Sequence, residues 1–299
     1  MTAFPTELES VRDWLRHAVS RFQAAKLTYG HGTDNAFDEA VFLVLATLNL
    51  PLDQLEPFLD ARLTGAERAA LHHAIDRRTI DRVPVPYLTH QAWLGKFKFY
   101  VDERVIIPRS FIAELLEERL ASWVADPDRI STALDLCTGS GCLAILLADA
   151  FPNADVDAID ISADALAVAQ HNVAEYSLQD RINLVRSDLF QNVNSEDKTY
   201  DLIISNPPYV TQAAMSVLPA EYRHEPEVAL AAGEDGLEAI RQIIDGARAY
   251  LNVGGILIVE AGHNRNLVEG AFADLPFTWL RTSTTDDKVF LLRREDLPV

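Results

Sequence analysis

The tetrapeptide Asn206-Pro207-Pro208-Tyr209 follows the apolar run Leu202-Ile203-Ile204, so we expect it at the end of a buried strand, where it can face a substrate. Each proline restricts the residue before it, which holds the Asn206 amide and the Pro207 carbonyl in fixed directions. Two fixed acceptors can bind one planar NH2 group, and Tyr209 offers a ring face to a flat amide or base. An Asn-Pro pair alone would indicate a loop that merely ends a strand, but four such residues after a strand favour a binding role.

A glycine-rich turn lies upstream of this tetrapeptide. The apolar run Ala133 to Cys137, which contains Asp135, leads into Thr138-Gly139-Ser140-Gly141, and a helical pattern then runs from Cys142 to Ala150. Glycine lets a ligand approach the backbone closely, and the start of a helix offers free N–H groups and a positive dipole end. The same order of strand, turn and helix occurs in dinucleotide folds and in purely structural turns, so the turn alone does not identify a ligand.

Two acids end the next predicted strands. Asp160 closes the run 155–160, nineteen residues after Gly141, and an acid at that place can accept both hydroxyls of a ribose. Dinucleotide-binding proteins share this spacing, so Asp160 does not by itself separate one nucleotide cofactor from another. Asp188 follows the predicted strand 182–185 and can accept from an adenine amino group, or it can cap the following turn.

Residues 1–85 have the pattern of a small helical domain. Apolar side chains recur at helical spacing near the N-terminus and again over residues 36–48. Thr6 and Thr64 each have a glutamate three residues later, the pattern of a capping box, and Asn35 can cap the helix between them. The sequence therefore predicts three main helices in this domain.

Residues 86–108 are predicted to form a β-hairpin linker. The composition changes at the alternating valines and prolines of 83–86. Aromatic and aliphatic residues then alternate with polar ones over 93–101 and 105–107, as in short strands.

Residues 109–299 alternate strands and helices, which predicts an α/β domain with a doubly wound, mainly parallel sheet covered on both faces. The predicted helices include 111–123, 142–150 and 236–251. The predicted strands are 133–137, 155–160, 182–185, 201–205, 255–260 and a closing hairpin of 279–282 with 289–292. Ligands of such sheets bind outside the carboxyl ends of the strands, where one crevice can hold the glycine turn, Asp160 and the tetrapeptide together.

Composition sets further bounds. The 299 residues are 48% hydrophobic, enough for a large core and two units. No run of eighteen apolar residues or signal-peptide pattern occurs, so we expect a cytoplasmic protein without membrane contact. Cys137 and Cys142 are expected to stay reduced, and neither they nor the eight histidines form a metal-ligand pattern.

The net charge is −19, from 26 basic and 45 acidic residues. A chain this acidic is repelled by nucleic-acid phosphates, so direct DNA binding is not expected. A strongly basic protein partner would be attracted instead. The alternative is that the excess acid serves solubility or salt adaptation only.

Taken together, these motifs resemble those of the S-adenosylmethionine-dependent protein-glutamine methyltransferases, over nearly the whole chain. The residues that carry the resemblance are Asp135 to Gly141, Asp160, Ser187-Asp188 and Asn206 to Tyr209. The segment from Val105 to Leu115, and Cys137 where the general pattern has glycine, resemble the branch that modifies large-subunit ribosomal protein uL3. The release-factor branch usually reads Pro-Arg-Pro-Glu-Thr in that segment. Residues 225–227, 231–237 and 259–262 also resemble the uL3 branch, whereas Ala261-Gly262-His263-Asn264 departs from the usual Val-Gly-Asn.

The resemblance implies a seven-stranded, Rossmann-like class I methyltransferase fold that binds S-adenosylmethionine. It implies that the catalytic residues are Asn206, Pro207, Pro208 and Tyr209. The cofactor residues that it implies are Pro108, Arg109, Asp135, Cys137, Thr138, Gly139, Ser140, Gly141, Asp160, Asp188, Leu189 and Asn206. For Arg109 the alternative is a structural ion pair.

The implied reaction is methylation of the side-chain amide nitrogen of a glutamine in uL3, either free or in an assembly intermediate. In this reading residues 1–85 select the protein substrate, and neither the modified glutamine nor an oligomeric state is specified. Three alternatives remain: a release-factor glutamine methyltransferase, an adenine amino methyltransferase that uses the same grip on an NH2 group, and a cofactor-binding assembly factor without catalysis. The acidic charge disfavours the second, and the intact Asn206 and Asp160 disfavour the third.

Overall fold

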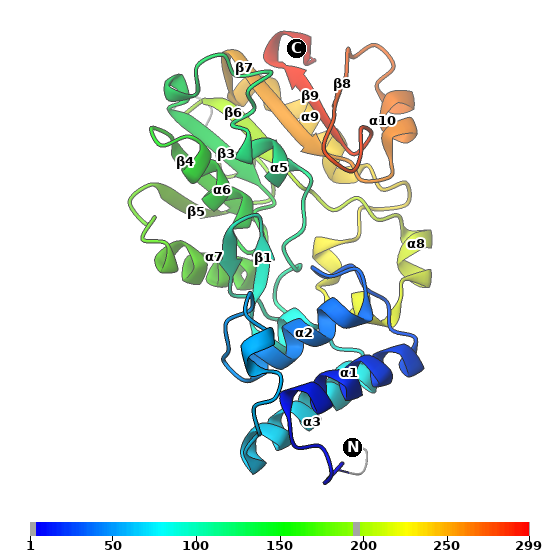
Figure 1. The fold of residues 1–299 in the computed structure, drawn as a ribbon. Helices are drawn as coiled ribbons and strands as arrows, with labels where there is room; N and C mark the ends of the chain where they lie inside the picture. The colour runs from blue at the N-terminus through cyan, green and yellow to red at the C-terminus, as the bar shows by residue number, and fades with distance from the viewer. Residues whose placement is uncertain (1–3, 194–197, 299) are drawn as a thin grey trace. The chain divides into compact units, whose positions relative to one another are not determined.

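The computed structural model describes residues 4–193 and 198–298, and its chain divides into two compact units (Figure 1). The first unit holds the residues up to Ala92 together with the segment Pro219–His224. The second holds Trp93–Leu218 and the chain from Glu225 onward. The chain therefore leaves the second unit shortly after the tetrapeptide and returns to it six residues later.

The first unit is helical, with a core built around Trp14, Phe22, Leu43 and Leu71, all fully buried. Its helices are α1 (Val11–Ala25), α2 (Ala36–Thr47), α3 (Gly65–Thr79) and α4 (Val85–Thr89), with a short 3-10 helix at Glu56–Phe58. The predicted helices of this region are confirmed.

Two of the three predicted helix caps are also confirmed. Asn35 accepts from the backbone at the start of α2, and Thr64 forms a capping box with Glu67 before α3. The predicted cap at Thr6 is wrong, because α1 is capped by Ser10 through a capping box with Asp13. Ser10 is extended and pairs with Arg62 in an isolated bridge, so the backbone cannot be helical before it.

A buried cluster of charged side chains ties the segment Pro219–His224 into the first unit. Arg78, fully buried, donates from Nε to Glu39 Oε1 at 2.7 Å. Glu221, 1% exposed, accepts on Oε1 from the Thr28 amide at 3.0 Å and from Arg82 Nη1 at 3.1 Å. Because Glu221 is far from the other members in sequence, no local pattern predicted this cluster.

The second unit is built on a seven-stranded sheet of order β5-β4-β3-β6-β7-β9-β8. The strands β3 to β7 pair in parallel where they are neighbours, and β9 is antiparallel to β7 and β8. Their bounds are β3 (Thr132–Leu136), β4 (Asp155–Asp160), β5 (Ile182–Arg186), β6 (Tyr200–Ser205), β7 (Leu251–Glu260), β8 (Thr278–Leu280) and β9 (Val289–Arg293). The predicted mainly parallel, seven-stranded α/β fold is confirmed.

Helices cover both faces of this sheet. α5 lies next to α6 and α6 next to α7, while α9 packs on the face that carries Leu134, Ile203 and Leu257 (Figure 1). The α-helices are α5 (Ile112–Glu117), α6 (Cys142–Ala150), α7 (Ala163–Glu175), α8 (Gln212–Val217), α9 (Glu238–Tyr250) and α10 (Arg265–Ala271). Short 3-10 helices lie at Pro127–Arg129, Ala220–His224, Glu227–Ala229 and Arg294–Asp296. A separate two-stranded sheet pairs β1 (Ala92–Leu94) with β2 (Phe97–Phe99).

Two predicted elements differ from the structure. The helix expected to run to residue 123 ends at Glu117, because Arg119 and Leu120 adopt left-handed backbone angles (φ 51° and 52°) that an α-helix cannot contain. Residues 105–107 are not a strand: the Ile107 amide donates to the side chain of Glu225 in place of a neighbouring strand. No helix in the described ranges 4–193 and 198–298 is both long and apolar enough to cross a membrane.

Glu221 should be one of the most stabilising single side chains of the first unit. Replacing it with alanine removes the buried carboxylate from Arg82 and from one side of Arg78, which keeps its bond to Glu39, so we expect Glu221→Ala to lower the free energy of unfolding by about 2 to 3 kcal/mol. Denaturant unfolding followed by circular dichroism measures the change. The matched control is Asp60→Ala, which removes the exposed pair with Arg12 and should leave the midpoint unchanged. Equal effects of the two substitutions would contradict the role of burial.

Candidate active site

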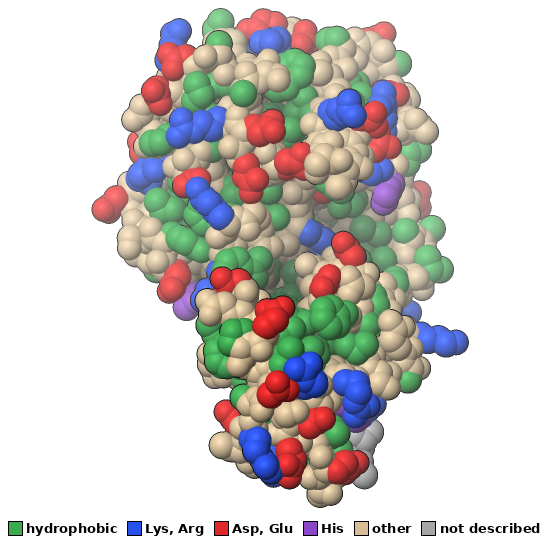
Figure 2. All heavy atoms as spheres, in the orientation of Figure 1, with side chains coloured by type: hydrophobic (Ala, Val, Ile, Leu, Met, Phe, Trp, Pro, Cys, Tyr) green, Lys and Arg blue, Asp and Glu red, His purple; other side chains and the backbone are tan. Residues whose placement is uncertain are grey.

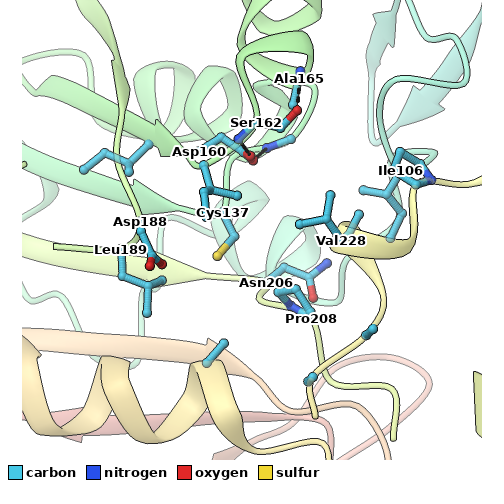
Figure 3. A pocket seen from close by; sticks show the side chains of 18 of the residues that line it. Ile106, Cys137, Asp160, Ser162, Ala165, Asp188, Leu189, Asn206, Pro208 and Val228 are labelled. Atoms are coloured by element: carbon cyan, nitrogen blue, oxygen red, sulfur yellow. Dashed lines mark hydrogen bonds between the residues drawn. The ribbon is translucent and has the colours of Figure 1, made fainter. Parts of the chain in front are cut away.

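A cavity of about 330 Å³ opens at the carboxyl ends of β3, β4, β5 and β6 (Figure 3). Its volume is in the range of small-molecule sites. Seven predicted site residues line it: Cys137, Gly139, Asp160, Asp188, Leu189, Asn206 and Pro208. All of its lining residues belong to the second unit.

In the glycine turn after β3, three of the five residues from Cys137 to Gly141 adopt left-handed backbone angles. Cys137, Gly139 and Gly141 have φ angles of 61°, 56° and 79°. Gly141 has no room for a side chain, since a Cβ would lie 3.1 Å from that of Ala169 in α7. The cysteine therefore occupies a strained position at the cavity wall, and burial raises the pKa of its thiol so that it stays neutral.

Asp160 is held in place by the backbone on both sides of it. Its Oδ2 accepts from the Gly139 amide at 2.8 Å, and its Oδ1 accepts from the Ser162 amide at 2.9 Å. Burial raises the pKa of the carboxyl, while these two bonds oppose that shift. The side chain at the end of β4 is thus fixed in direction, with lone pairs left for a ligand.

Asp188 and Asp135 differ in exposure. Asp188 is exposed at the cavity, on the same side as Leu189, and accepts from Gln191 Nε2 at 2.9 Å (Figure 3). Asp135 is fully buried and accepts from Thr138 Oγ1 at 2.6 Å, and burial raises its pKa to about 7. Asp135 does not line the cavity, so its visible contact supports the turn.

Asn206 presents an oxygen with no partner. Its Nδ2 donates to the carbonyl of Arg109 at 3.2 Å, which fixes the amide plane and directs the other end of the group away from that carbonyl. Its Oδ1 is buried and accepts no hydrogen bond within the part of the chain that the structure describes. A buried acceptor in this state costs free energy until a donor reaches it.

Arg109 holds this arrangement through its side chain. Its Nη2 donates to Glu225 Oε2 at 2.7 Å and its Nη1 to the Ile107 carbonyl at 3.2 Å. Glu225, 5% exposed, also accepts from the Ile107 amide. Neither Pro108 nor Arg109 lines the cavity, and the guanidinium has the ion-pair role that the sequence left as an alternative.

Tyr209 also lies outside the cavity lining. A Cβ on Gly262 would lie 2.5 Å from its ring, its carbonyl accepts from Asn264 Nδ2 at 2.8 Å, and its hydroxyl donates to Glu260 Oε1 at 3.4 Å. The stretch 260–264, whose sequence departs from the usual pattern, therefore cradles this ring. Pro207, Thr138, Ser140 and Gly141 lie beside the lining residues in the chain but do not belong to them.

Several lining residues were not predicted as site residues. Four of them, Ile106, Ser187, Pro226 and Ala231, lie in segments that carried the family resemblance, but their types indicated no chemical role. The others include the apolar Ile159, Ile161, Ala165, Val228 and Ala239 and the polar Arg104, Ser162, Glu238 and Gln242. Ile106 and Val228 lie on the same side of the cavity as Asn206 (Figure 3).

Comparison with known proteins shows the family to which this chain is similar. A family model described as "Methyltransferase small domain" matches residues 113–221. The ribosomal protein uL3 glutamine methyltransferase of Neisseria gonorrhoeae is 56% identical over 97% of this chain and 96% of its own. The protein of the same name from Burkholderia pseudomallei is 56% identical over 100% of this chain and 99% of its own.

A third relative of that name, from Bordetella pertussis, is 55% identical over 97% of both chains. Among solved structures, a ribosomal protein L11 methylase from Lactobacillus delbrueckii covers 64% of this chain and 82% of its own at 22% identity, with a TM-score of 0.43. The resemblance inferred from the sequence is confirmed by the full-length relatives, and the chain belongs to the family of ribosomal protein uL3 glutamine methyltransferases.

Proposed function

We propose that this protein transfers the methyl group of S-adenosylmethionine to the side-chain amide nitrogen of a glutamine in ribosomal protein uL3. The observation that carries the proposal is the unpartnered Oδ1 of Asn206 at a cavity wall. An acceptor oriented in this way suits a substrate that brings N–H donors. The names of the full-length relatives support both the reaction and the substrate.

The residues of the cavity fit S-adenosylmethionine. The fixed carboxylate of Asp160 suits the ribose hydroxyls, and the exposed carboxylate of Asp188 suits the adenine amino group. Gly139 and Ile106 both line the cavity, and a Cβ on Gly139 would lie 3.6 Å from Ile106. The absence of a side chain at Gly139 therefore leaves this space to a ligand. When bound, S-adenosylmethionine supplies a methyl group that its sulfonium already activates.

The chain's own part in the reaction is to orient the substrate amide. A glutamine nitrogen is a poor nucleophile because its lone pair is delocalised into the carbonyl. Asn206 Oδ1 and the Pro207 carbonyl can accept its two N–H groups, which localises the lone pair and directs it. As the N–CH3 bond forms, the S–CH3 bond breaks and S-adenosylhomocysteine leaves. The N–H proton becomes acidic only at this point and passes to water, so two neutral acceptors suffice and no strong base is required. Contact of the Tyr209 ring with the amide plane stays a prediction.

A pair of acceptors that binds an NH2 group could also serve methylation of adenine in nucleic acid. The net charge of −19 disfavours this alternative. The acid excess is uneven. Residues 1–92 carry 12 acidic and 9 basic side chains, whereas residues 93–299 carry 33 and 17. On the face drawn in Figure 2, acidic and basic side chains are interspersed. Attraction of a basic protein would therefore act mainly through the larger unit.

The helical unit is proposed to select the protein substrate. None of its residues from Phe4 onward lines the cavity, and its helices build an independent core. With nearly balanced charge, it would recognise the substrate by shape and apolar contact. Phe37 at the start of α2, 52% exposed between Asp34 and Asp38 in the sequence, is the type of residue that such a contact uses.

Replacing Asp160 tests the cofactor. Asp160→Ala removes the acceptor for the ribose hydroxyls and should weaken S-adenosylmethionine binding by roughly 1.5 to 3 kcal/mol, about tenfold or more in Kd. Isothermal calorimetry measures the change. Asp155→Ala, at the exposed start of the same strand, is the matched control and should bind normally. Unchanged affinity of the first variant would remove Asp160 from the site.

Replacing Asn206 tests its proposed hydrogen bond to the substrate amide. Asn206→Ala should keep the fold and bind S-adenosylmethionine normally, but lower the single-turnover rate on uL3 roughly 100-fold, as expected for one aligned polar group. Asn206→Asp is the matched comparison, because it keeps an acceptor and loses the donor to Arg109. A fall of less than about fivefold in the alanine variant would disprove the two-acceptor mechanism.

Removing the helical unit tests substrate selection. A chain that starts at Gln91 keeps every cavity residue, so it should still bind S-adenosylmethionine, yet lose most of its activity on intact uL3. The truncation also removes the partners of Glu221. Full-length Glu221→Gln is therefore measured beside it and should retain activity. Selection by the helices would be refuted by full activity of the shortened chain, or by an equal loss in Glu221→Gln.

A further inference from the structure

Glu260 is a buried carboxylate next to the site that the proposed reaction does not yet use. It is the last residue of β7 and is 2% exposed. Its Oε2 accepts from Ser110 Oγ at 2.7 Å and from the Phe111 amide at 2.9 Å. Its Oε1 accepts from the Tyr209 hydroxyl at 3.4 Å. One side chain thus joins two segments that are about 100 residues apart in sequence.

Both segments determine the position of Asn206. The segment at Ser110 and Phe111 follows directly on Arg109, whose carbonyl accepts from the Asn206 amide. Tyr209 closes the tetrapeptide that begins with Asn206. Glu260 itself is absent from the cavity lining, so it can act on the substrate only through these neighbours.

The charged surroundings of Glu260 are sparse. Among the described residues, the ionisable groups that act on its carboxyl are Tyr209 and Arg109, which lies on the segment before α5, while its partner in β9 is the uncharged Val289. The Arg109 guanidinium is bound to Glu225. A carboxylate is costly at such a place unless its hydrogen bonds serve a purpose.

We infer that Glu260 is a positioning residue for methyl transfer: it fixes Tyr209 and the segment after Arg109 relative to each other, so that Asn206 keeps its acceptor oxygen directed at the substrate amide. This inference rests on the function proposed above. It assigns to the end of β7 a part in the rate of the reaction and none in cofactor binding.

The protonation state of Glu260 gives the inference a pH dependence. Burial raises its pKa to about 7, and the bonds from Ser110, Phe111 and Tyr209 oppose that shift. Above this pH the carboxylate accepts all three donors. Below it the added proton turns one oxygen into a donor, and the bridge weakens. The rate should therefore fall as the pH is lowered through about 7.

The experiment compares two carboxylate–tyrosine pairs of this chain, each with a buried carboxylate. The test pair is Glu260 with Tyr209. The control pair is Asp157 with Tyr200, which bond at 2.6 Å, are both buried and do not line the cavity, whereas Tyr209 in the test pair is half-buried. Glu260→Gln, Tyr209→Phe, their double variant and Asp157→Asn are assayed in full-length protein with S-adenosylmethionine and uL3. kcat, KM and cofactor Kd are measured between pH 6 and pH 9.

We expect Glu260→Gln to lower kcat roughly tenfold or more and to leave the cofactor Kd within about threefold of wild type. The fall in kcat below about pH 7, the acid limb of the pH profile, should be absent in this variant. Because Glu260 acts through Tyr209, the double variant should be no slower than about twice the slower single variant. Asp157→Asn should lower thermal stability and keep the wild-type kcat and pH profile.

Three results would overturn the inference. They are a kcat of Glu260→Gln within twofold of wild type, an acid limb that persists in that variant, and fully multiplicative effects in the double variant. A persistent limb would belong to another group, such as Asp135. Failure of the proposed function gives a different result, because the wild-type protein would then transfer no methyl group to uL3 at any pH, whereas the three failures above are comparisons among variants of an active enzyme. If Glu260→Gln does not fold, Tyr209→Phe alone must lower kcat at least fivefold, and a smaller loss refutes the inference.

Discussion

The hydrogen bond from Asn206 Nδ2 to the Arg109 carbonyl decides what this site can bind. An asparagine amide has a donor end and an acceptor end, and with the opposite orientation the cavity wall would present N–H groups that repel the donors of a substrate amide. The Arg109 carbonyl can play this part because its own segment is held by Glu225. In the proposed function, selectivity for an NH2 group would thus depend on the ion pair between Arg109 and Glu225, neither of which lines the cavity.

The order of the strands supplies the second condition. β3 carries the glycine turn and β6 the tetrapeptide, and the two are far apart in sequence but paired in the sheet. The chain fills β3, β4 and β5 in one direction and then returns to β6 on the other side of β3. Their helices leave toward opposite faces at this switch, which opens a crevice at the carboxyl ends. Asp160 and Asn206 therefore face one cavity without any special adaptation of either strand.

Local signals in the sequence were sufficient for the fold and for the residues at strand ends. The bounds of β4, the cap at Thr64 and the placement of Asp160 all follow from periodicity and from residue type at a known offset. Glu225 and Glu260 were not predicted as structural carboxylates, because their partners Arg109 and Ser110 lie more than 100 residues away. The end of α5 was missed for a different reason: nothing in the types of Arg119 and Leu120 announces a left-handed backbone.

Buried carboxylates replace regular secondary structure around this cavity. Backbone N–H groups must be paired when they are removed from water, and three segments at or next to the cavity, around Gly139, Ile107 and Phe111, lie outside helices and strands. The amides of Gly139, Ile107 and Phe111 each donate to a carboxylate: the half-buried Asp160 and the buried Glu225 and Glu260, respectively. A carboxylate pairs such an amide more strongly than a neutral acceptor does, since the bond is charge-assisted. It also makes the geometry of the loops dependent on ionisation, and burial raises the pKa of both Asp160 and Glu260. The carboxylates that order the irregular backbone therefore also make the geometry of the site depend on pH.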